Sequence, residues 1–111
     1  PTANLDPFFA KTILNLLKEI QKKENITIII SEHRMDLILS LIDEIILIDN
    51  GKLLIHDSKE KVVNSEEFRK VQINHPIIYS IFDELKKKDI FKENIPVSIP
   101  SAVQALKDLK K

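Results

Sequence analysis

A run of β-branched residues at 26–30 constrains the fold of this chain more than any other feature. The sequence there reads Ile-Thr-Ile-Ile-Ile and is followed by Ser31, Glu32 and His33. Such a run is typical of a strand that is buried on both faces of a parallel sheet. Ligands of open α/β sheets bind beyond the carboxyl ends of the strands, which is where these three polar residues would emerge. His33 is therefore the first candidate functional residue.

A helix is predicted before this run. Asp6 suits the N-cap and Pro7 suits the first position of a helix that we expect to end near Lys23. Its apolar residues recur at three- and four-residue spacing, which indicates that one face lies on a sheet. These residues are Phe9, Ile13, Leu16, Leu17 and Ile20.

A hairpin is predicted after the run. Residues 44–49, Glu-Ile-Ile-Leu-Ile-Asp, indicate a second buried strand. The Asn50-Gly51 pair that follows favours a tight turn, because both central positions of such a turn need a positive φ. The turn would join this strand to an antiparallel strand at 52–56. We therefore expect the closing edge of an α/β sheet with an antiparallel extension.

The rest of the chain is predicted to be mainly helical. Helices are expected over residues 35–41, 59–63, 65–71 and 77–88 and after Ser101. Ser58 and Ser101 are placed to cap two of them. Ile78, Ile81, Phe82 and Leu85 would share one side of the 77–88 helix, and Val103, Leu106 and Leu109 one side of the last helix. We place a subdomain boundary near residue 64, which separates 1–63 from 64–111.

Composition argues against several classes of function. Lys and Arg number 17, as do Asp and Glu, so no net positive field is available to hold nucleic acid or an anionic membrane. Cysteine is absent, which excludes a disulfide framework and a thiolate metal site. No apolar run approaches the roughly 18–20 residues that span a bilayer. We expect a cytoplasmic segment, and its 111 residues and initial Pro1 indicate part of a longer protein.

Three segments carry a resemblance to a known family. Residues 1–6, Pro-Thr-Ala-Asn-Leu-Asp, resemble the end of the Walker B motif and the D-loop of ABC-type ATPases. Residues 31–34, Ser-Glu-His-Arg, resemble the switch-histidine segment of these enzymes, and residues 43–52 resemble the segment that follows it. The order and spacing agree over residues 1 to about 63. The fold implied is the C-terminal portion of a P-loop ABC ATPase sheet, followed by a small helical extension.

The remainder is similar to the C-terminal extension of energy-coupling-factor ATPases, the motor subunits of vitamin and cobalt or nickel importers. The resemblance rests on His75-Pro76, a lysine-rich helix end, and the Ile-Pro-Val-Ser segment at 95–98. Two positions depart from the family pattern. Ser101 replaces an often acidic residue before Ala102, and a glycine usual after the hairpin is missing.

The resemblance implies specific residue roles. His33 would be catalytic, contacting the ATP γ-phosphate and orienting the attacking water. Asp6 would reach across a head-to-tail ATPase dimer, with Ala3, Asn4 and Leu5 shaping the D-loop. The catalytic glutamate would immediately precede Pro1, and no metal ligand is assigned within this chain.

The resemblance also implies cofactors and partners. The intact protein would be an ATPase that uses ATP and Mg²⁺ on the cytoplasmic face of the membrane. It would bind a second ATPase subunit, a transmembrane coupling subunit and a substrate-binding membrane subunit. The chain itself has one glycine and no G-x-x-x-x-G-K-[ST] loop, so we expect it to be inactive alone.

The competing hypothesis is a non-catalytic helical dimerisation or interaction module at 65–111, for which Ile78 and Phe82 would be contact residues. Nucleic-acid binding is disfavoured by the zero formal charge. His56 and His75 are interpreted as surface or turn residues. The transported substrate and the choice between an identical and a different ATPase partner stay open.

Overall fold

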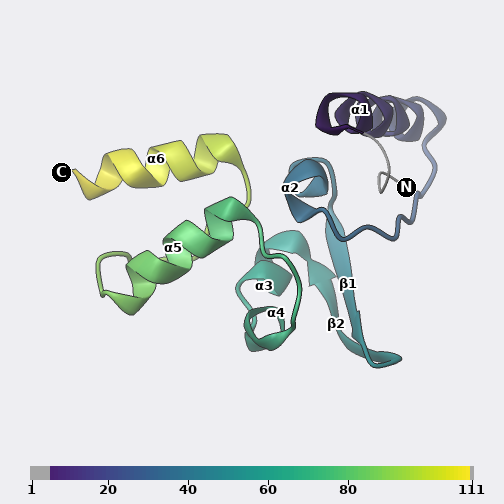
Figure 1. Ribbon diagram of the computed structural model, residues 1–111. Coiled ribbons are helices and arrows are strands. Elements are labelled where there is room, and N and C mark those ends of the chain that lie inside the picture. The colour runs from purple at the N-terminus through teal and green to yellow at the C-terminus, as the bar shows by residue number, and fades with distance from the viewer. Residues whose placement is uncertain (1–5, 111) are drawn as a thin grey trace.

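The computed structural model describes residues 6–110 and has helices at both ends and a β-hairpin between them (Figure 1). The order along the chain is α1 (Pro7–Glu24), α2 (Met35–Ile38), β1 (Glu44–Asp49), β2 (Lys52–Ser58), α3 (Lys59–Val63), α4 (Glu66–Lys70), α5 (Ile77–Lys87) and α6 (Ile99–Leu109). Among these residues, no helix has the length and apolarity needed to cross a membrane. The α/β class predicted from the sequence is confirmed.

The predicted hairpin is confirmed. Strands β1 and β2 pair in antiparallel fashion, and the turn residues Asn50 and Gly51 have φ values of 50° and 74°. Leu47 pairs with Ile55 and Ile48 pairs with Leu53, so Leu54 is an extra residue that forms a bulge. The turn projects away from α1 (Figure 1).

The prediction of a strand at 26–30 is wrong. This segment has no strand conformation in the structure, and Ile29 is 83% exposed. A β-branched run becomes a buried strand only when neighbouring strands satisfy its backbone groups. In residues 6–110 the only sheet is the β1–β2 pair, and it does not include this segment. For the same reason β1, predicted to be buried, has only Leu47 buried.

The helix predicted to end near Lys23 is confirmed, with a different buried face. Asp6 caps it, because its Oδ1 accepts the Phe9 backbone N–H at 3.1 Å. Ala10 and Leu14 are the buried residues of α1. Three of the predicted face residues, Phe9, Leu16 and Ile20, are exposed instead. The described part of the chain holds no large sheet for that face to cover.

The cap of the last helix is also corrected. The helix begins after Ser98, whose Oγ accepts the backbone N–H of Ser101 at 3.3 Å. The helix thus starts three residues earlier than predicted, with Pro100 in its first turn, where a missing N–H has no cost. Ala102 is buried, whereas the predicted face residues Val103, Leu106 and Leu109 are exposed.

One hydrophobic core runs through the described residues on both sides of residue 64. It contains Met35, Ile38 and Leu47 from the first part, and Phe68, Tyr79, Phe82, Phe91 and Val97 from the second. At the predicted boundary, Asn64 is bonded to the second part, because its Oδ1 accepts the Ile95 N–H at 2.7 Å and its Nδ2 donates to the Ile95 carbonyl at 3.2 Å. A subdomain boundary near residue 64 stays a prediction.

Candidate functional site

The segment that carries His33 connects residues 26–30, which form no strand, to α2. Oε1 of Glu32 accepts the backbone N–H of His33 at 3.0 Å and that of Arg34 at 3.2 Å. One carboxylate therefore satisfies two successive amides and holds the turn that precedes α2. His33 itself is exposed. An exposed imidazole on a braced backbone is available to a ligand brought from outside this segment.

The predicted D-loop is only partly within the described residues. Asp6 is exposed and caps α1 through its bond to the Phe9 amide. Ala3, Asn4 and Leu5 lie outside the described residues, so their roles stay predictions. Capping uses one oxygen of the Asp6 carboxylate.

A cleft of about 430 Å³ lies between α1, residues 26–32, α2 and β1. Its walls are mostly apolar, with Leu14, Leu17, Met35 and Ile38 among the lining residues. Its polar lining residues are Lys18, Gln21, Thr27, Glu32, Asp43 and Glu44, and the Lys18 Nζ lies 3.8 Å from Asp43 Oδ2. It has no glycine-rich loop, so it lacks the backbone cradle that phosphate binding favours.

A second hollow, of about 350 Å³, lies on the helical extension beside His75 and Tyr79. Nε2 of His75 is 2.7 Å from the Phe68 carbonyl oxygen, and a carbonyl can only accept, so this nitrogen carries the proton. The His75 ring stacks on Tyr79 at 4.8 Å and meets Phe68 edge-on at 5.0 Å. Burial, with the Asp83 charge as a smaller cause, raises the pKa of the Tyr79 hydroxyl.

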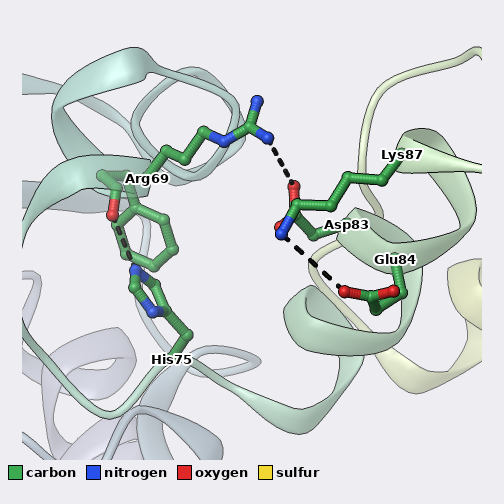
Figure 2. A network of polar contacts seen from close by, with 6 residues as sticks. Arg69, His75, Asp83, Glu84 and Lys87 are labelled. Atoms are coloured by element: carbon green, nitrogen blue, oxygen red, sulfur yellow. Dashed lines mark hydrogen bonds and ion pairs between the residues drawn. The ribbon is translucent and has the colours of Figure 1, made fainter.

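Charged side chains rim this hollow (Figure 2). Asp83 lies 3.9 Å from Arg69 and 3.5 Å from Lys87, and Lys87 lies 3.7 Å from Glu84. Each of these pairs has at least one side chain about half exposed, so each adds only a few tenths of a kcal/mol. The two charges of each sign offset one another, which gives the hollow no preference for an anion or a cation.

The two remaining histidines have structural partners that the sequence reading missed. His75 lies in the turn between α4 and α5, which was one of the two predicted alternatives, but its ring is half-buried in the aromatic cluster. His56 is exposed, as predicted, and its Nε2 lies 2.9 Å from Oε1 of Glu44 on the paired strand. Within residues 6–110, no group of three His, Cys, Asp or Glu side chains could hold a metal ion.

Comparison with known proteins places these features in context. No family model matches the chain. It is 38% identical over 109 residues to a protein of Bacillus anthracis named as an ABC transporter ATP-binding protein, covering 97% of this chain and 19% of that one. It is 32% identical over 114 residues to an energy-coupling factor transporter ATP-binding protein of Mesoplasma florum. The match covers 100% of this chain and 36% of that protein.

An ABC transporter ATP-binding protein of Pyrococcus horikoshii is also similar, with 34% identity over 96 residues that cover 86% of this chain and 34% of that protein. Among the relatives described here, the chain spans 19% to 36% of the relative's length. The similarity therefore extends over nearly all of this chain and a minor part of each relative.

Proposed function

Because this chain is homologous over nearly all of its length to ABC transporter ATP-binding proteins, we propose that it is the part of such an ATPase that supplies the switch histidine and D-loop. The observation that carries the proposal is the exposed His33, which follows a β-branched run and is held by Glu32. The spacing from the Asn-Leu-Asp segment at 4–6 to His33 supports the same assignment.

The proposed role of His33 is to contact the γ-phosphate of ATP and to orient the attacking water. Phosphoryl transfer requires little covalent chemistry from the protein, so positioning and stabilisation of charge account for most of the rate. The bonds from Glu32 to two backbone amides would limit the motion of the His33 backbone. Asp6 would couple the two nucleotide sites of an ATPase dimer, and the intact protein would use ATP and Mg²⁺.

The proposed setting is an importer of the energy-coupling-factor type that takes up metal ions, such as cobalt or nickel, or vitamins. This rests on the likeness to an energy-coupling factor transporter ATP-binding protein over the whole chain, including the helical extension. The intact protein would lie on the cytoplasmic face of the membrane. A second ATPase subunit, a transmembrane coupling subunit and a substrate-binding membrane subunit would be its partners.

The chain alone is expected to neither bind nor hydrolyse ATP. It has a single glycine and cannot form a phosphate-binding loop of the P-loop type. Release of phosphate from ATP by the purified 111-residue chain should equal the rate of a His33→Ala control. Phosphate release that is lost in the His33→Ala chain would contradict this proposal, because it would show a complete site in these residues.

A second candidate function, a helical interaction module, is favoured by exposed apolar residues on α5 and α6. Ile77 is 66% exposed and Ile99 is 71% exposed, and Ile81 is exposed on the same helix as Ile77. Phe82, predicted from the sequence to be a contact residue, is fully buried. Its replacement would therefore report on folding instead of pairing.

If α5 is a pairing surface, Ile81→Glu should shift the chain from dimer to monomer in sedimentation experiments, because a charge would be buried in the interface. Ser80→Glu is the matched control, since Ser80 is an exposed polar neighbour on the same helix. A chain that is monomeric before any substitution, at concentrations up to hundreds of micromolar, would remove this candidate.

A further inference from the structure

A carboxylate next to the switch segment caps a helix of the C-terminal extension. Oδ1 of Asp36 accepts the backbone N–H of Ile77 at 3.0 Å, across a sequence separation of 41 residues. Asp36 lies in the first turn of α2, three positions after His33, and Ile77 is the first residue of α5. This contact joins the two parts of the chain three residues after the candidate catalytic residue.

The contact meets a need of α5 that its own sequence does not meet. The first N–H groups of a helix have no partner within it, and a side chain at the N-cap usually supplies one. The residue at the N-cap of α5 is Pro76, whose ring has no hydrogen-bonding atom. A carboxylate at this position also interacts favourably with the positive end of the helix dipole, and charge-assisted bonds are stronger than neutral ones.

The same contact restricts α2. Met35 and Ile38 hold this short helix on the core from one side, because both are buried. Asp36 is exposed and is bonded to α5 from another side, so the helix is held at two places. The turn braced by Glu32 leads directly into α2 through Arg34. Displacement of α5 would therefore move α2 and the backbone that carries His33.

We infer that Asp36 is a positioning residue for His33, which it acts on by tying α2 to the start of α5. The helical extension then controls where the imidazole lies, and a partner that displaces α5 would change the placement of His33. The consequence for ATP hydrolysis rests on the proposed function of His33. The coupling of α2 to α5 does not rest on that function, so an experiment can disprove the coupling and the proposed function separately.

The first test is NMR of the 111-residue chain. In Asp36→Ala we expect the Ile77 amide to exchange about tenfold faster, which is the size of effect that loss of a cap gives, and the His33 ring signals to shift. Asp36→Asn should restore both, because its side-chain oxygen can accept the same N–H. Glu93→Ala, which removes an exposed carboxylate between α5 and α6, should change neither.

The His33 signals separate positioning from simple capping. Faster exchange of Ile77 with unchanged His33 signals in Asp36→Ala would overturn the inference, since α5 would then be capped without any effect on the switch segment. Unchanged exchange of Ile77 would overturn it as well. If Asp36→Ala unfolds the chain, Asp36→Asn is measured instead. The inference requires that the exchange rate of its Ile77 amide and its His33 ring signals equal those of the unsubstituted chain.

The second test uses the intact ATPase. There Asp36→Ala should lower kcat about tenfold, the effect expected from a small misplacement of a catalytic group, with little change in KM, and Asp36→Asn should restore kcat. If His33→Ala lowers kcat while Asp36→Ala leaves it unchanged, the inference fails and the proposed function stands. If His33→Ala has no effect on kcat, the proposed function fails, and the NMR result still decides the coupling.

Discussion

Replacing His33 with alanine in the intact ATPase should lower kcat by about 10²–10³-fold, the loss seen when one group that stabilises transition-state charge is removed. KM for ATP should change little, because the proposed contact matters most when the γ-phosphate is transferred and not when ATP binds. The measurement is steady-state phosphate release at saturating ATP. His56→Ala is the matched control, since His56 is also exposed but lies on the hairpin.

Equal losses of kcat in the two histidine variants would contradict this prediction. They would mean that removal of any exposed imidazole disturbs the protein and that His33 has no special role. A His33→Ala enzyme with nearly full kcat would contradict it more directly, and the interaction-module hypothesis would then be preferred.

Replacing Phe68 with alanine should lower the free energy of unfolding by about 3–5 kcal/mol. Phe68 is 0% exposed, and its ring meets those of His75 and Tyr79 edge-on, each at 5.0 Å between ring centres. Truncation would leave a cavity between α4 and α5. Small domains are stable by only about 5–15 kcal/mol, so much of this variant should be unfolded at moderate temperature.

The measurement is urea unfolding of the 111-residue chain followed by circular dichroism. Phe8→Ala is the matched control, because the Phe8 side chain is 82% exposed and its loss should change the unfolding free energy by less than about 0.5 kcal/mol. A Phe68→Ala chain with the stability of the control would show that the aromatic cluster is not packed as described.

Local signals predicted the elements that depend on neighbours in sequence. The Asn50-Gly51 turn formed as expected, because the conformation it needs is available to those two residues whatever surrounds them. Asp6 and Ser58 cap the helices that follow them, through bonds to the Phe9 and Lys61 amides. In each case the donor and the acceptor lie within three residues of each other.

Features that depend on distant parts of the chain were not predictable. The run at 26–30 has the composition of a buried strand, but a strand also requires a pairing neighbour, which residues 6–110 do not provide for it. The bond from Asp36 to Ile77 joins residues 41 apart and has no local signal. The contact between Glu44 and His56 could have been found once the hairpin register was known.

The candidate site was predicted in part. The place of His33 after a β-branched run and the family likeness predict a functional residue there, and in the structure His33 is exposed, with Glu32 bonded to its backbone amide. The bracing role of Glu32 was missed, although a carboxylate one residue before a turn is a usual acceptor for the amides that follow. The role of His75 was missed because its partners, Phe68 and Tyr79, come together only in the folded core.

The sequence of the native coding region immediately upstream of Pro1 tests the central claim most directly. The account predicts a β-branched run that ends in Asp-Glu just before Pro1, with a glycine-rich phosphate-binding loop of the form G-x-x-x-x-G-K-[ST] farther upstream. A reading frame that has no such loop and no acidic pair at that position would contradict the proposal that this chain contributes His33 to an ATP-hydrolysing site.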